Sequence, residues 1–160
     1  MIELLLGYTG NRDEALVLFD YTESVKLAVA VFGFAAVALV AQNAVTARAG
    51  VYTAEQAEAG EAAYKADCAS CHGAELEGSG RQTPPLKGEE FMAGWRELML
   101  GDLFDKIQEA MPADKPGTLS RERNAQILAF ILKTNGYPAG ATALPTQAAE
   151  LGKIQLGTRK

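Results

Sequence analysis

Three residues whose types and spacing could do chemistry lie together in one short segment. Cys68, Cys71 and His72 are the two cysteines and the single histidine of the 160-residue chain, and they form the pattern Cys-x-x-Cys-His. Two thiols three positions apart on one helical turn can each add to a vinyl group of haem, and the imidazole that follows can bind the iron. The pattern therefore predicts one covalently attached haem c, held by thioethers from Cys68 and Cys71, with His72 as an iron ligand.

Two other chemistries use a Cys-x-x-Cys pair. A thioredoxin-like redox dithiol is typical of an α/β context, which this sequence does not indicate. A structural zinc site usually takes four Cys or His ligands, and this chain has only three in total. Both alternatives fit the pattern less well than haem attachment does.

Helical segments surround the motif, and no segment alternates as a strand does. Thr53 is a suitable N-cap for a helix over residues 54–67, which leads directly into the motif. Residues 73–87 are rich in Gly and Pro and predict a loop, and the segment from Ala139 onward is expected to pack loosely on the surface. Three further helices are predicted, over residues 89–95, 98–110 and 120–133. The expected fold class is all-α, with three to five helices around the haem.

The N-terminal part of the chain carries a targeting pattern. Residues 27–41 are almost uninterruptedly apolar, but this run is shorter than the roughly twenty residues that a membrane-spanning helix needs. It is followed by Ala47-Arg48-Ala49, a small-x-small pattern typical of signal-peptide cleavage. We therefore expect residues 1–49 to be a leader and signal peptide, and residues 50–160 to be the mature domain. The alternative is an uncleaved membrane anchor.

Residues 1–24 fit a signal peptide poorly, because a leading segment should be short and basic. This one contains Glu3, Asp13, Glu14, Asp20 and Glu23. We hypothesise that translation begins at Val25, so that residues 1–24 are not translated. A longer, genuine leader is the alternative.

The composition is that of a globular protein, with 48% hydrophobic and 22% charged residues and a formal net charge of −5. Nucleic-acid binding needs concentrated positive charge, and the chain has no cluster of Lys or Arg. Nucleic acid and anionic membrane surfaces are therefore excluded as expected partners.

Beyond the haem motif, residues 54–136 resemble the class I cytochromes c, here of the bacterial periplasmic mono-haem type. The resemblance rests on Gly60-x3-Tyr64-x3-Cys68, which is similar to the family's first helix, and on residues 127–132, similar to its last helix. It rests also on Pro84-x-Leu86-x-Gly88, similar to a family loop. In that loop a proline carbonyl accepts a hydrogen bond from the proximal histidine. The resemblance gives this role to Pro84, with the adjacent Pro85 as the alternative.

The family resemblance also implies a second iron ligand. Met111-Pro112, after the predicted helix over residues 98–110, matches the place where the family has its ligand methionine. The resemblance therefore implies that His72 and Met111 are the two metal ligands, with Met92 and Met99 as alternatives. Trp95 is expected either to line the haem pocket or to be a core aromatic. Arg81 and Arg96 are expected either to balance haem propionate charge or to lie solvated on the surface.

A six-coordinate iron has no open position for oxygen or peroxide, so the resemblance implies a single-electron carrier and not an enzyme. The expected location is the periplasm, where haem attachment in bacteria takes place. Expected partners are a periplasmic dehydrogenase or respiratory complex and a terminal acceptor; the membrane is a partner only if the N-terminal segment is uncleaved. Two alternatives stay open: an enzyme or ligand sensor in which Met111 is absent or labile, and a membrane-tethered subunit of a larger complex.

Overall fold

The computed structural model describes residues 45–80 and 83–157. The apolar run over residues 27–41, the proposed start at Val25 and Arg81 lie outside the described residues. The described residues begin at Val45, five positions before the expected domain start at Gly50.

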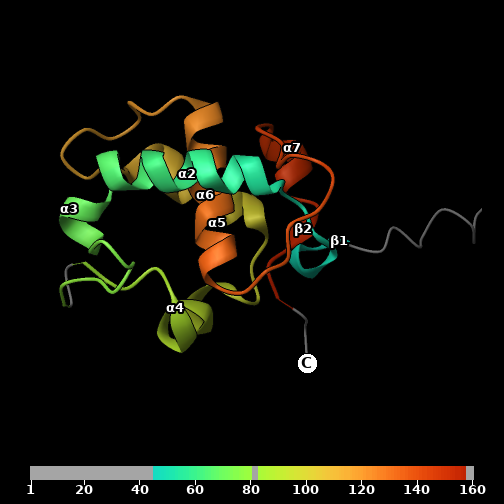
Figure 1. The fold of residues 1–160 in the computed structure, drawn as a ribbon, viewed down its shortest axis with the longest axis horizontal. Coiled ribbons are helices and arrows are strands. Elements are labelled where there is room, and N and C mark those ends of the chain that lie inside the picture. Colours follow the sequence, from blue (N-terminus) through green and yellow to red (C-terminus); the bar gives the residue numbers. More distant parts are fainter. Residues whose placement is uncertain (1–44, 81–82, 158–160) are drawn as a thin grey trace, which may run out of the picture. The chain divides into compact units, whose positions relative to one another are not determined.

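The described residues form an all-α domain with one very small sheet (Figure 1). Four helices have eight or more residues, a number within the predicted range of three to five helices. Two further α-helices have four residues each, and a short 3₁₀ helix lies near the start. In chain order the elements are β1 (Val45–Thr46), η1 (Ala47–Ala49), α2 (Ala54–Asp67), α3 (Ala69–His72), α4 (Gly88–Trp95), α5 (Leu100–Ala110), α6 (Arg121–Thr134), α7 (Ala148–Leu151) and β2 (Ile154–Gln155). Within these described ranges no helix has the length and apolar character needed to cross a membrane.

Side-chain caps fix the starts of the two longest helices. The Thr53 hydroxyl accepts a hydrogen bond from the backbone N–H of Gln56 at 3.2 Å, and the Ser120 hydroxyl accepts one from Arg123 at 3.1 Å. Each cap satisfies an N–H group that the helix itself leaves unpaired. The predicted helices 54–67 and 120–133 are confirmed to within one residue at each end, and the caps explain where they begin.

Helix α2 crosses α6 at Gly60. A Cβ atom at Gly60 would lie only 1.8 Å from the carbonyl oxygen of Gln126, so the two backbones approach as closely as they do because this residue has no side chain. One turn further along α2, the ring of Tyr64 packs against that of Phe130, with 5.4 Å between ring centroids. This crossing fixes the end of α2 from which the haem-attachment segment continues.

The C-terminal segment is not loosely packed, contrary to the expectation from its Gly, Pro and Thr content. We call residues 138–157 the C-terminal strap. Leu144, Leu151 and Leu156 are almost fully buried in the core. Their burial stabilises the strap by removing apolar area from water. Near its end the strap contains β2, which pairs in parallel with β1 at the opposite end of the described chain. In this pairing Val45 lies opposite Ile154.

Candidate haem site

The Cys-x-x-Cys-His segment is one tight helical turn. Cys68 ends α2 and precedes α3, and its carbonyl oxygen accepts backbone hydrogen bonds from Cys71 at 3.1 Å and from His72 at 2.9 Å. The two cysteines are not joined in a disulfide; Cys68 is half-buried and Cys71 is exposed. Both thiols are thus present on one turn, as haem attachment requires.

His72 is oriented by a backbone partner on the loop that follows. Its Nδ1 atom lies 2.9 Å from the carbonyl oxygen of Pro84, and not of Pro85. A carbonyl oxygen can only accept a hydrogen bond, so Nδ1 must carry the proton and donate it. The other ring nitrogen, Nε2, then has a lone pair with which to bind a metal ion. His72 is buried, with 8% of the residue's surface exposed, which limits the motion of its side chain.

A chain of hydrogen bonds holds the loop that carries Pro84. The N–H of Leu86 donates to the carbonyl of Leu76 at 2.9 Å, and the side-chain amide of Asn135 donates to the carbonyl of Leu86 at 2.9 Å. The same Asn135 amide group donates to Ile131, and its oxygen accepts from the N–H of Gly88. Asn135 therefore ties the end of α6 to the loop, a role that the sequence analysis did not predict.

Tyr64 supports the segment from inside the core. Its ring is fully buried, and its hydroxyl donates a hydrogen bond to the carbonyl oxygen of Gly73 at 2.7 Å. Burial raises the pKa of the Tyr64 phenol well above its ordinary value of 10.0, because the charged form would lose its hydration. Tyr64 is therefore a neutral donor that fixes the residue directly after His72.

Cys68 differs from Cys71 in its surroundings. Burial raises the pKa of the Cys68 thiol to about 11, and the nearby carboxylate of Asp67 acts in the same direction. Asp67 is itself paired with the Arg123 side chain, which joins the end of α2 to the start of α6. At neutral pH the haem-free chain therefore presents Cys68 as a protonated thiol and not as a reactive thiolate.

The three candidate methionines lie in different settings. Met111 is the residue at which α5 ends, has extended backbone dihedrals and is half-buried against the core. The sulfur of Met92, in α4, accepts a hydrogen bond from the Tyr137 hydroxyl at 3.8 Å. Met99 directly precedes α5 and forms an antiparallel backbone β-bridge with Gln155. The sequence had predicted Met99 inside a helix over residues 98–110, and the structure places it outside α5.

The structure places Trp95 and Arg96 next to each other at the end of α4. Trp95 is half-buried against the core, with its ring centroid 6.2 Å from that of Phe91. One terminal nitrogen of the Arg96 guanidinium, Nη2, donates to both carboxylate oxygens of Glu89, each at 2.7 Å, and Nε donates to the Met92 carbonyl at 3.3 Å. An ion pair at an exposed position such as this contributes little to stability.

The apolar residues around the motif fit a large apolar cofactor. Several side chains are packed against the core yet only partly covered: Val51, Cys68, Ala69, Leu86, Met92, Trp95 and Met111. Cys68 and Met111 are among the predicted haem-binding residues, Met92 was an alternative ligand, and Trp95 was expected either to line the haem pocket or to be a core aromatic. Together with the thiols and an Nε2 lone pair, they supply covalent, metal-binding and apolar contacts for haem. In the described part of the chain no group of three or more His, Cys, Asp or Glu side chains is close enough to hold a metal ion by itself.

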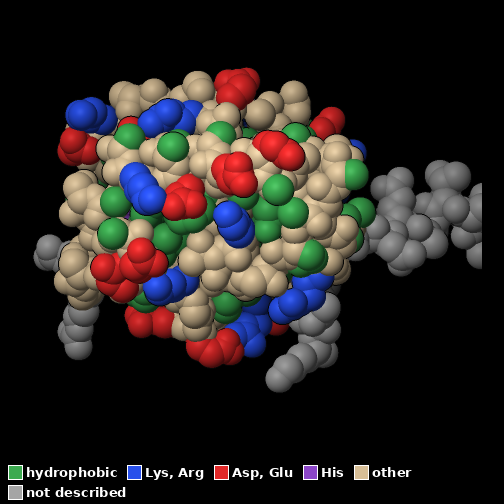
Figure 2. All heavy atoms as spheres, viewed as in Figure 1, with side chains coloured by type: hydrophobic (Ala, Val, Ile, Leu, Met, Phe, Trp, Pro, Cys, Tyr) green, Lys and Arg blue, Asp and Glu red, His purple; other side chains and the backbone are tan. Residues whose placement is uncertain are grey.

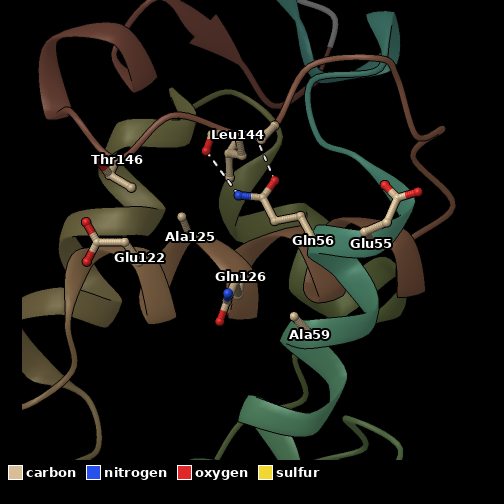
Figure 3. Close-up of a pocket in the computed structure, with 9 residues that line it drawn as sticks. Glu55, Gln56, Ala59, Glu122, Ala125, Gln126, Leu144 and Thr146 are labelled. Carbon is tan, nitrogen blue, oxygen red and sulfur yellow. Dashed lines mark hydrogen bonds between the residues drawn. The ribbon is translucent and has the colours of Figure 1, made fainter.

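A groove of about 460 Å³ lies at the other end of α2 (Figure 3). Its lining comes from the first turns of α2 and α6 and from the C-terminal strap. Gln56 bridges it: its amide nitrogen donates to the carbonyl of Leu144 at 3.1 Å, and its oxygen accepts from the N–H of Leu144 at 2.7 Å. Since α2 has 14 residues, about 20 Å long, this groove is distinct from the haem-attachment segment.

Comparison with known proteins gives a family match and one similar structure. Residues 55–131 match the family model described as cytochrome C oxidase, cbb3-type, subunit III. No curated protein matches the chain. A chain in the crystal structure of the sulfane dehydrogenase SoxCD from Paracoccus pantotrophus is 24% identical, with a TM-score of 0.47. The match covers 72% of this chain and 62% of that chain, so it spans less than two thirds of the SoxCD chain.

The matched residues contain the Cys-x-x-Cys-His turn and most of the two crossing helices, α2 and α6. These residues form a class I c-type cytochrome domain with the small all-α cytochrome c fold. It carries haem c, bound covalently through Cys68 and Cys71, and it transfers electrons through that haem.

Proposed function

We propose that this protein is a single-electron carrier in the periplasm, with a haem iron ligated by His72 and Met111. The observation that carries the proposal is the hydrogen bond between His72 Nδ1 and the Pro84 carbonyl. That bond assigns the ring proton and directs the remaining lone pair to the iron. When bound, the haem supplies the one-electron chemistry, with iron that alternates between the ferric and ferrous states.

The residues of the chain have separate tasks in this proposal. Cys68 and Cys71 hold the cofactor permanently, so that it is not lost between partners. The Pro84 carbonyl makes the His72 imidazole a better electron donor to the metal and fixes its orientation. Apolar side chains such as Leu86 and Trp95 exclude water from the cofactor, which keeps the change of solvation small during electron transfer.

Met111 is the favoured second ligand because of its place in the fold. It lies at the end of α5, half-buried, with an extended backbone that leaves the helix. The sulfur of Met92, in contrast, is already engaged by the Tyr137 hydroxyl. A neutral thioether ligand favours ferrous iron and raises the reduction potential. Two strong ligands also leave no position for substrate, which supports a carrier and not an enzyme.

The partners we propose are a periplasmic dehydrogenase or respiratory complex and a terminal acceptor. Support comes from the family resemblance and from the matched family model, whose description names an oxidase subunit. On the face of the molecule in Figure 2, acidic and basic side chains are interspersed and neither kind forms a continuous patch. Such a surface supports brief contacts with modest electrostatic steering.

The absorption spectrum and the reduction potential of the ferric protein test this proposal. Wild type is expected to show the methionine-sulfur-to-iron charge-transfer band. The variant Met111→Ala should keep covalent haem but lose the band and have a lower potential, whereas Met92→Ala should keep both. A high-spin ferric spectrum of wild type, with rapid binding of cyanide to the ferric protein or of carbon monoxide to the reduced protein, would contradict the carrier function. If Met111→Ala kept both the band and the potential, Met111 would not be the ligand.

A further inference from the structure

The first described residues of the chain are part of the folded domain. Val45 and Thr46 form β1, which pairs with Ile154 and Gln155 at the end of the strap. Ala47 follows in η1 and is completely buried, with 0% of its surface exposed. Residues on both sides of the Ala47-Arg48-Ala49 pattern are therefore structural parts of the core and the sheet.

The residues that follow Ala47 contact the part of the chain directly after α6. The guanidinium of Arg48 lies 5.3 Å from the centre of the Tyr137 ring, a cation–π distance. Gly50 packs against Gly140 so closely that a Cβ atom at Gly140 would lie 2.0 Å from the Gly50 carbonyl oxygen. The hydroxyl of Tyr52 donates to the Tyr137 carbonyl at 2.6 Å.

We infer that residues Val45–Ala49 remain in the mature protein, so that its N-terminus lies at or before Val45. Cleavage after Ala49 would remove the only strand with which β2 pairs among the described residues, and it would remove a buried alanine from the core. Packing explains the small residue at position 47, because Ala47 is enclosed by the core. The inference does not depend on which methionine binds the iron.

The N-terminus of the exported protein is the direct test. The full chain is produced from its own sequence in a host that attaches haem, and the purified haem protein is analysed by intact mass and N-terminal peptide mapping. An N-terminus at or before Val45 supports the inference. An N-terminus at Gly50, or at any residue after Val45, would overturn it.

A matched pair of variants distinguishes an effect on the packing of the core from an effect on cleavage of the signal peptide. Ala49 is exposed, whereas Ala47 is enclosed, and a large residue at either position would block a small-x-small cleavage site. Ala49→Leu should leave both the mature N-terminus and the midpoint of thermal unfolding unchanged. Ala47→Leu should leave the N-terminus unchanged but lower the midpoint by about 5 °C or more, through overpacking. If Ala49→Leu produced a longer, unprocessed protein, cleavage after Ala49 would be established and the inference would be wrong.

A pair of truncated chains gives an independent readout. Two versions behind the same foreign signal peptide, one that begins at Ala44 and one at Gly50, are compared as haem-loaded proteins. The shorter chain should unfold at a midpoint lower by about 5 °C or more, because β1 and Ala47 are missing. Equal midpoints would show that residues 45–49 do not contribute to the fold and would overturn the inference.

Discussion

Replacing Gly60 by alanine adds one methyl group where α2 crosses α6. A Cβ atom at this position lies 1.8 Å from the carbonyl oxygen of Gln126, and this neighbour is backbone, which cannot rotate away. Heavy atoms that are not bonded pack at about 3.5 Å. The two helices must therefore separate locally by roughly 1.5 Å, a movement that also loosens the packing between Tyr64 and Phe130.

The expected change in the free energy of unfolding is the difference between two opposing effects. Alanine is favoured over glycine inside a helix by about 1 kcal/mol. Overpacking of a well-filled interior costs about 1–3 kcal/mol, and sometimes more. Because the overlap is with backbone, the upper end of this range applies, and the free energy of unfolding should fall by about 2 kcal/mol. For a domain of this size the midpoint of thermal unfolding should fall by about 8 °C.

The assay is guanidinium unfolding of the haem-loaded protein, followed by far-ultraviolet circular dichroism and by haem absorbance. Gly94→Ala is the matched control, since Gly94 is exposed in α4 and a Cβ atom there has no neighbour within 4 Å. This control should be as stable as wild type or more stable by up to about 1 kcal/mol. If Gly60→Ala were as stable as Gly94→Ala, the close helix crossing described for this fold would be wrong.

Three further changes have expected outcomes. Tyr64→Phe should lower the free energy of unfolding by about 1 kcal/mol at pH 7, because the hydrogen bond to Gly73 is lost. In wild type, the free energy of unfolding should also fall above pH 10, because the phenol ionises in the unfolded chain before it ionises in the folded protein. When stability is measured against pH, this fall should be smaller in the variant. Asn135→Ala should lower the free energy of unfolding by about 1–3 kcal/mol, because the loop that holds Pro84 is loosened. The reduction potential should rise, because His72 then donates less electron density to the iron. An unchanged potential in voltammetry would contradict this link. Gln56→Ala should speed amide hydrogen exchange at Leu144, and exchange as slow as in wild type would show that Gln56 does not hold the strap.

Much of the fold near the haem segment could be predicted, because its signals are local. Thr53 and Ser120 have the hydroxyls that cap helix starts. With these caps, the helix-forming residues of α2 and the apolar face of α6 predicted both helices almost to the residue. The Cys-x-x-Cys-His pattern is equally local, since all its members share one helical turn. The partner of His72 came from a family resemblance, and the structure places the Pro84 carbonyl at hydrogen-bond distance.

Other parts of the fold could not be predicted because their partners are distant in sequence. Leu144 and Leu151 are single apolar residues among Gly, Pro, Thr and Ala, so no period marks their burial. Strands of two residues, such as β1 and β2, are too short for an alternating pattern. Asn135 has a typical helix-end residue type, and its bond to Leu86 depends on how α6 lies against the loop.

The pairing of β1 with β2 also sets an order in which the molecule can be completed. Val45 and Ile154 lie near opposite ends of the described chain, and synthesis proceeds from the N-terminus. The sheet and the strap can therefore close only after almost the whole chain has emerged. Cys68 and Cys71 emerge well before that point, while the strap residues that complete the core are still missing. The pairing of β1 with β2 thus allows both thiols to be exposed on an incomplete chain, before the sheet and the strap can close.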